Sequence, residues 1–301
     1  MVSPLCVGGC PMGEHGWGQV NTQDFIDLIH EALATGVNFF DTADIYGLGK
    51  SEQTLGKALK GQRNKAIIAT KFGVRRDQGK SIYDNSPSWM DQALNESLKR
   101  LETDYIDLYQ VHYWDGVTPI EEIIAKLESY QKKGMIRTYG ISNIDESHMK
   151  KFDPFMTHFV SVQNEYSLAT RTHEEDLFQF HQKYGMSLLL WGSLGQGVFT
   201  GKYHLQSHFE EGDRRNRPEY VNFHGEKFKK NLEIVEMLKK MAEKYQKPLS
   251  AVALRFVLDY LPQSIVLAGM KNIGQLQHNT QSLGWKLEME DLQRLEKISR
   301  S

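Results

Sequence analysis

The sequence has few of the features that mark membrane, secreted or metal-binding proteins. No run of 18 apolar residues occurs, so no transmembrane helix is expected, and the first ten residues carry no charged region of the kind that opens a secretory signal. The two cysteines, Cys6 and Cys10, are four residues apart and on one extended segment would lie too far apart to form a disulfide. These observations favour a reduced, cytoplasmic chain.

Charge and motifs exclude further classes of function. The formal net charge is −2 and no basic run occurs, which argues against a nucleic-acid or membrane-surface partner. No His-Glu-x-x-His or Cys-x-x-Cys motif is present, so no metal is predicted. The sequence leaves the oligomeric state open.

Short apolar runs alternate with amphipathic stretches along the whole chain. The alternation predicts parallel strands joined by helices. The predicted helices include one that Thr22 caps, with an apolar face that reaches Leu33. Others cover residues 51–61, 88–101, 119–133, 173–184, 226–245 and 249–261, and helices are expected after the last strand. The predicted strands cover residues 5–8, 37–40, 66–69, 105–111, 137–141, 159–162, 187–190 and 265–267. Eight such units favour one α/β domain over residues 1–301, a closed (β/α)8 TIM barrel. The open-sheet alternative requires a Gly-x-Gly-x-x-Gly motif after the first strand, and the loop GGCPMGEHGWG lacks that spacing.

The predicted strand ends carry polar groups with complementary chemistry. In a barrel, functional groups lie at the carboxyl ends of the strands, where Asp41, Lys71 and His112 follow three apolar runs and Tyr46 follows in a loop. Each residue alone has a simpler interpretation: a turn aspartate, a solvated lysine, a core histidine, a packed tyrosine. Together they form an acid–base set.

The chemistry of this set suits proton transfer to a reacting carbonyl. A tyrosine hydroxyl has an ordinary pKa of about 10, and a nearby ammonium lowers it. We expect Lys71 to supply the ammonium, Asp41 to neutralise and orient Lys71, and neutral His112 to donate to a carbonyl oxygen or tune the tyrosine. Without a metal, the accompanying hydride must come from an organic cofactor.

Several short sequence blocks along the chain together resemble those of the aldo-keto reductase superfamily. The matching blocks cover about residues 3–298 and occur in the family's order: GVNFFDTADIYG, IATKFG, DYIDLYQVH, GISN, SVQNEYSL and GVFTGKY. The resemblance implies an NADPH-dependent oxidoreductase with Tyr46 as general acid and Asp41, Lys71 and His112 as its catalytic partners. It extends to the bacterial branch that carries a Gly-Ser-Leu loop after the seventh strand.

The resemblance also implies a cofactor site. Ser142, Asn143 and Gln163 would bind the nicotinamide carboxamide, Trp191 would stack on its ring, and Lys271 and Gln275 would lie near the 2′-phosphate. NADH remains possible because Gln275 stands where some branches use arginine. The residues expected around the cofactor are Gly9, Cys10, Asp41, Ser142, Asn143, Gln163, Trp191, Gly192, Ser193, Leu194, Gln196, Gly197, Lys202, Gly269, Lys271, Gln275, His278 and Asn279.

The sequence constrains the identity of the substrate and the direction of the reaction less tightly than the cofactor site. Tyr113 and Trp114 are expected to form an aromatic wall with Trp17 opposite, beside Tyr46 and His112, which suits a sugar or an aromatic or ring-bearing carbonyl. The same residues could work in the oxidising direction on a sugar or polyol. A third possibility is a cofactor-sensing binding module that resembles the potassium-channel β subunits. The cluster DRRNRP is interpreted as a solvated loop, with contact to a cofactor phosphate as the alternative.

Overall fold

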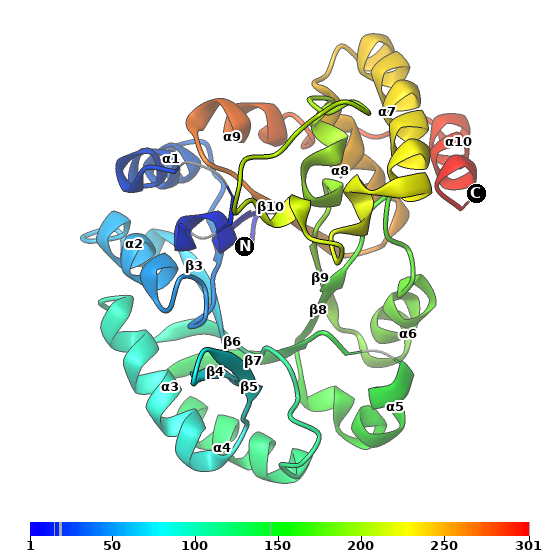
Figure 1. Ribbon diagram of the computed structural model, residues 1–301. Helices are drawn as coiled ribbons and strands as arrows, with labels where there is room; N and C mark the ends of the chain where they lie inside the picture. The colour runs from blue at the N-terminus through cyan, green and yellow to red at the C-terminus, as the bar shows by residue number, and fades with distance from the viewer. Residues whose placement is uncertain (15, 18–19, 145, 301) are drawn as a thin grey trace.

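The computed structural model describes residues 1–14, 16–17, 20–144 and 146–300. Its centre is a closed barrel of eight parallel strands in the order β1-β10-β9-β8-β7-β6-β3-β2 (Figure 1). The barrel strands are β1 (Leu5–Gly8), β2 (Phe39–Asp41), β3 (Ile67–Phe72), β6 (Ile106–Val111), β7 (Ile136–Ser142), β8 (Ser161–Glu165), β9 (Ser187–Trp191) and β10 (Ser264–Gly269). The predicted (β/α)8 barrel is therefore confirmed.

Helices surround the barrel and pack their apolar faces on it (Figure 1). They are α1 (Thr22–Ala34), α2 (Lys50–Ala58), α3 (Pro87–Arg100), α4 (Ile120–Lys132), α5 (Glu146–Phe152), α6 (Glu174–Tyr184), α7 (Gly225–Tyr245), α8 (Leu249–Tyr260), α9 (Ile273–Thr280) and α10 (Met289–Arg300). The sequence did not predict the short helix α5. None of the helices in the described ranges is long and apolar enough to cross a bilayer.

Two predicted helix caps are wrong by one or two residues. The Asn21 side chain, not Thr22, accepts from a backbone N–H group at the start of α1. At α2 the helix begins at Lys50 after Gly49, which has a φ of 93°. Ser51 lies one residue inside α2, where its hydroxyl donates to the carbonyl oxygen of Gly9 at 2.8 Å. Its role is to tie α2 to the loop after β1.

Strand register explains why distant polar residues meet. Gly8 pairs with Asp41, Asp41 with Ala69, and Lys71 with Gln110, so residues of neighbouring strands lie level at the same end of the barrel. Beneath them a second apolar cluster joins inward-facing residues of several strands, among them Cys6, Phe39, Leu108 and Leu267. The polar strand ends therefore lie next to a buried apolar layer inside the barrel.

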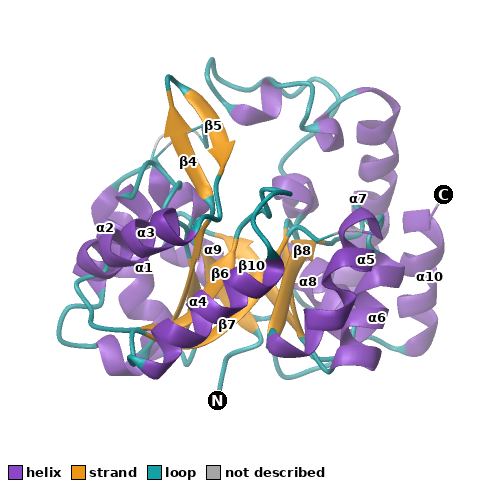
Figure 2. Ribbon diagram, turned by 90° about the horizontal axis from the view of Figure 1, so that it is seen from below, coloured by secondary structure: helices purple, strands orange, loops and turns teal. Residues whose placement is uncertain are grey.

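A hairpin that the sequence analysis did not predict stands over this end. Strands β4 (Val74–Asp77) and β5 (Lys80–Tyr83) pair only with each other, in antiparallel register. Their turn contains Gly79 with a φ of 80°. Figure 2 shows the hairpin at the same end as the long loop before α7, opposite the N-terminus. Its polar residues lack the apolar alternation of a half-buried strand, which is why it was missed.

Candidate active site

A buried ion pair lies at the centre of the polar strand ends. Lys71 Nζ is 2.6 Å from Asp41 Oδ1 and donates to the carbonyl oxygen of Thr42 at 2.8 Å. The side chains of Lys71 and Asp41 are 1% and 4% exposed. Such a pair holds its geometry because each charge needs the other in a medium of low polarity. Asp41 therefore neutralises and orients Lys71, as its sequence position predicts.

Tyr46 lies over this ion pair. Lys71 Nζ is 3.5 Å from the Tyr46 hydroxyl and 5.0 Å from the centre of its ring. Burial raises the pKa of Tyr46 well above its usual value, and the negative charge of Asp41 raises it further. The expected lowering of the Tyr46 pKa is not found in this state of the site, because burial is the largest effect and raises it. Tyr46 is therefore protonated at neutral pH.

His112 is the second group beside the Tyr46 hydroxyl. Its ring meets that of Tyr46 edge to face, with centroids 5.8 Å apart. Burial and then the charge of Lys71 hold the pKa of His112 well below its usual value, so the imidazole is neutral. Its Nδ1 is buried and has no hydrogen-bond partner among the residues that the structure describes. A neutral imidazole can donate or accept one proton, which fits the expected role at a carbonyl oxygen.

Buried amide groups continue the site across the barrel. Gln163 Nε2 donates to Asp41 Oδ2 at 2.8 Å, and Gln110 Nε2 lies 3.3 Å from the same oxygen. The Ser142 hydroxyl donates to the Gln163 carbonyl oxygen, and Asn143 donates to the His112 carbonyl oxygen. Four strand ends are thereby cross-linked into one rigid polar floor. Gln110 belongs to this floor although the sequence analysis did not include it.

One large cavity of about 1180 Å³ opens above this floor. Catalytic candidates Asp41, Tyr46 and His112 line it, whereas Lys71 lies beneath its surface with a fully buried side chain. The cavity walls contain every residue that the sequence analysis expected around the cofactor: Gly9, Cys10, Asp41, Ser142, Asn143, Gln163, Trp191, Gly192, Ser193, Leu194, Gln196, Gly197, Lys202, Gly269, Lys271, Gln275, His278 and Asn279.

The far end of the cavity is cationic. Lys202, Arg215 and Lys271 line it. Burial and then the neighbouring Arg215 charge lower the pKa of Lys271. Arg215 is an ion-pair partner of Asp213, which holds it in place. Cations held close together favour a compact anion such as a phosphate group.

Two sequence interpretations need correction here. The DRRNRP cluster is only partly solvated. Arg214 and Arg215 line the cavity and Asp213 is buried, whereas the residues from Asn216 to Pro218 are exposed. Trp114 does not line the cavity. Its indole N–H donates to the Thr118 carbonyl oxygen at 2.9 Å and its ring packs edge-on against Phe152 of α5. Trp114 thus packs against α5, a helix that the sequence did not predict, and lies outside the cavity.

The aromatic wall is made by other residues. Tyr113 lines the cavity as expected, but its stacking partner is Tyr83 of the hairpin, at a centroid distance of 4.8 Å. On the other side Trp17 lines the cavity as expected and packs edge-on against Tyr220. Sequence reasoning missed Tyr83 and Tyr220. Both stand in polar segments without periodicity, so no local pattern marked them.

Glu165 is a third residue that the sequence analysis missed. It lies at the end of β8, lines the cavity and accepts from the Gln196 amide at 3.2 Å. Burial raises its pKa to about 6, against a smaller lowering by Thr170. The signal that could have found it is its place two residues after Gln163, on the same strand face.

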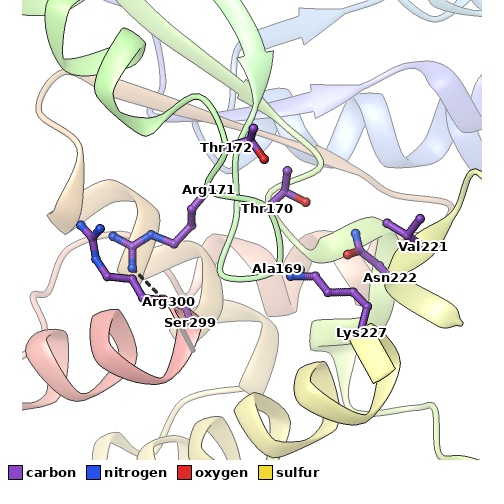
Figure 3. A pocket seen from close by; sticks show the side chains of 9 residues that line it. All are labelled: Ala169, Thr170, Arg171, Thr172, Val221, Asn222, Lys227, Ser299 and Arg300. Carbon is purple, nitrogen blue, oxygen red and sulfur yellow. Dashed lines mark hydrogen bonds between the residues drawn. The ribbon is translucent and has the colours of Figure 1, made fainter. Parts of the chain in front are cut away.

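A smaller cavity of about 400 Å³ lies between the loop before α6 and helices α7 and α10 (Figure 3). Two of its cations are already engaged: Arg171 donates to the Ser299 hydroxyl at 2.7 Å, and Arg300 donates to Glu174 at 2.6 Å. These contacts hold the last helix against the barrel. Among the described residues, no group of three or more His, Cys, Asp or Glu side chains is arranged to hold a metal ion.

Fold and site together define a (β/α)8 barrel with a tyrosine, lysine, aspartate and histidine cluster at the carboxyl ends of its strands. The sequence model of the Aldo/keto reductase family matches residues 4–300, and the chain belongs to this family.

Individual relatives agree with this assignment. The chain is 35% identical to an aldo-keto reductase of Bacillus subtilis, over 96% of this chain and 87% of the relative. It is 32% identical to an NADP(+) aldo-keto reductase of Schizosaccharomyces pombe, over 93% and 83% of the two chains. Among solved structures, a glycerol dehydrogenase from Gluconobacter oxydans has a TM-score of 0.88 at 33% identity, covering 99% of this chain and 91% of that one.

Proposed function

We propose that this protein reduces an aldehyde or ketone to an alcohol with NADPH, with Tyr46 as the general acid. The observation that carries the proposal is the protonated Tyr46 hydroxyl 3.5 Å from Lys71 Nζ, which is itself paired with Asp41. Membership of the Aldo/keto reductase family supports the reaction class.

The cavity fits a nicotinamide dinucleotide by its chemistry. Amide and hydroxyl groups of Ser142, Asn143 and Gln163 suit the carboxamide, and the cations at the other end suit phosphates. Between them the segment Gly195–Thr200 contains Gln196 and Gly197 at φ values of 57° and 108°, a backbone form that can direct N–H groups at an anion. The NADP(+) in the name of the fission-yeast relative supports NADPH, and NADH remains possible.

The protein's own part in the reaction is proton transfer and charge stabilisation. NADPH held in this cavity would supply a hydride for the carbonyl carbon. As the carbonyl oxygen gains negative charge, it becomes basic enough to take the proton of Tyr46. The Lys71 ammonium stabilises the phenolate left behind, and neutral His112 is placed to hydrogen-bond the same oxygen. The proton of Tyr46 is then restored from water.

The first prediction tests this role. Tyr46→Phe removes only the hydroxyl, so cofactor binding should be unchanged, while kcat for carbonyl reduction should fall by about a hundred- to ten-thousand-fold. Cofactor binding is measured by fluorescence titration with NADPH, and kcat by loss of the reduced-cofactor absorbance. Undiminished turnover in Tyr46→Phe would overturn the mechanism.

The oxidising direction is a second candidate. The same proton transfer runs both ways, and the structurally similar glycerol dehydrogenase is named for the oxidation of a polyol. Turnover of glycerol and sugars with NADP⁺, compared with turnover of the matching aldehydes with NADPH, decides between the two. A binding module of the potassium-channel β-subunit kind would show tight cofactor binding with negligible turnover in both directions.

Both cysteines carry free thiols, which supports a cytoplasmic location.

A further inference from the structure

Two neighbouring arginines in the long loop before α7 differ in their surroundings. Arg215 is held by Asp213 and hydrogen-bonds to the Tyr203 hydroxyl. For Arg214 the described residues provide no ion pair, and its Nε is buried without a hydrogen-bond partner. Arg214 Nη1 lies 4.0 Å from the Cys10 sulfur, which is a weak acceptor. A guanidinium that gives up water without an acceptor loses stability, and an anionic ligand would restore it.

Backbone and side-chain contacts hold Arg214 close to the loop after β1. Its backbone N–H donates to the Gly16 carbonyl oxygen at 3.0 Å. A Cβ atom at Gly16 would lie 2.5 Å from Arg214 Cγ, so glycine leaves the space through which the side chain passes. The guanidinium then lies 5.9 Å from the centre of the Trp17 ring. This loop contact directs Arg214 into the cavity.

Arg214 belongs to the reaction end of the cavity. Its neighbours Cys10 and Trp17 follow β1, and its positive charge acts on Tyr46 and lowers the pKa that burial raises. Arg215 instead acts on Lys271, together with Lys202, at the cationic end. The two adjacent arginines therefore act on different groups of one cavity.

The carboxylates in the cavity wall do not neutralise Arg214. Glu165 is engaged by the amide of Gln196 and the hydroxyl of Thr170, on the side of β8 and β9. Glu219 lines the cavity but forms no ion pair with Arg214 in the part of the chain that the structure describes. Arg214 therefore lines the cavity without a carboxylate partner among the described residues.

We propose that the substrate is a carbonyl compound that also carries a carboxylate or a phosphate, and that Arg214 binds this anionic group while Tyr46 faces the carbonyl oxygen. The inference rests on the proposed function. A planar guanidinium binds either anion through two parallel hydrogen bonds, and aromatic pairs on both sides of the cavity accept the body of the substrate.

The experiment compares matched substrates that differ in charge. One pair is 4-carboxybenzaldehyde and its methyl ester, and the other is glyceraldehyde 3-phosphate and glyceraldehyde. The wild-type protein should favour the anionic member of at least one pair in kcat/KM, and the favoured pair identifies the anion. In Arg214→Gln this preference should fall about ten- to a hundredfold, mainly through KM. Arg214→Lys should retain part of it.

Arg217→Gln is the control, because Arg217 is exposed, lies outside the cavity and changes the net charge by the same amount. It should leave the preference unchanged. The inference is overturned if the wild-type protein prefers the neutral members. It is also overturned if Arg214→Gln weakens NADPH binding while the preference stays, since Arg214 would then belong to the cofactor.

A binding measurement separates this inference from the proposed function. Calorimetry with the NADP⁺ complex should show that benzoate binds the wild-type protein and binds Arg214→Gln at least tenfold more weakly. Benzyl alcohol at the same concentration should not bind. This result is independent of turnover, so it would stand even if no carbonyl compound were reduced. Equal benzoate binding by both proteins would overturn the role of Arg214.

Discussion

At the scale of single residues, the site depends on a charge pair that neither partner could maintain alone. Asp41 Oδ1 faces the Lys71 ammonium, and its Oδ2 faces the amide donors of Gln163 and Gln110. Both carboxylate oxygens therefore accept, and no donor can stand at either position in the observed arrangement. The local environment selects aspartate over asparagine by hydrogen-bond direction as well as by charge.

We predict that Asp41→Asn destabilises the protein by about 3–5 kcal/mol, because it leaves the Lys71 ammonium buried and unpaired and turns an NH₂ group toward a donor. The free energy of unfolding is measured in urea at pH 7. The double variant Asp41→Leu with Lys71→Met removes both charges and should be closer to the wild-type protein. Equal losses in the single and double variants would show that the pair is not what the fold requires.

Glu165 contributes a pH-dependent loss of stability. Its pKa rises from an ordinary value of 4.5 to about 6 in the folded protein, because burial disfavours the carboxylate. Between these two values the folded protein binds more protons than the unfolded chain, so stability falls as pH rises from 4.5 to 6 and remains lower above that range. A difference of 1.5 pKa units corresponds to about 2 kcal/mol.

We therefore predict that Glu165→Gln stabilises the protein by up to about 2 kcal/mol at pH 7.5 and has little effect near pH 4.5. A glutamine keeps an oxygen that can accept from Gln196 and Thr170. Urea unfolding at the two pH values, without cofactor, measures the effect. A stabilisation that is the same at both values would contradict the assigned titration.

At the scale of elements, the site depends on close contact between two loops. Gly13 ends the turn after β1 and Gly47 follows Tyr46 after β2, and the backbones touch at these two glycines. A Cβ atom at Gly47 would lie 2.2 Å from the Gly13 carbonyl oxygen, and Gly47 has a φ of 59°. The contact holds the Tyr46 loop against the β1 loop, and both line the cavity.

Gly47→Ala should therefore lower the free energy of unfolding by about 2–4 kcal/mol, from the left-handed backbone and the clash together, and lower kcat by displacing Tyr46. Gly61→Ala is a matched control, since Gly61 has a φ of 74° but nothing within 4 Å of the added Cβ. The control should lose only the backbone contribution of about 1 kcal/mol. Equal losses in the two variants would show that the contact between the loops is not important.

At the scale of the whole molecule, the C-terminal helix is tied to the barrel by a small charged cluster. Arg171 donates to Glu174, to the Glu296 carbonyl oxygen and to the Ser299 hydroxyl. Burial alone would raise the pKa of Glu174, but hydrogen bonds from Arg171 and Tyr166 hold it below its usual value. The cluster joins residues more than 120 positions apart, at the smaller cavity of Figure 3.

Arg171→Met should reduce stability by about 2–4 kcal/mol at pH 7, because Glu174 loses its main partner. Since the folded pKa of Glu174 is lowered, its contribution is present above the ordinary value of 4.5 and disappears as pH falls through the lower folded value. The difference between wild type and variant should shrink accordingly in acid. Arg294→Met, on an exposed face of α10, should change stability by less than about 0.5 kcal/mol.

Much of this could be predicted from the sequence because it depends on local patterns. Apolar runs that end in a polar group identified the eight strands and placed Asp41, Lys71 and His112 at one end of the barrel. The glycines and lysines of the cavity wall were indicated by the family resemblance and not by a local pattern. In a parallel barrel, strand ends must meet, so a list of strand ends is already a list of neighbours.

Only the tertiary structure decided the contacts that have no local pattern. It placed Tyr83 and Tyr220 in the cavity and turned Trp114 away to pack against Phe152. It also brought Arg214 into the site, where no described residue forms an ion pair with it. It also reversed the expected direction of the Tyr46 pKa. The physical reason is the same in each case. Local periodicity determines which residues form a strand or helix, whereas burial and charge depend on which distant segments cover them.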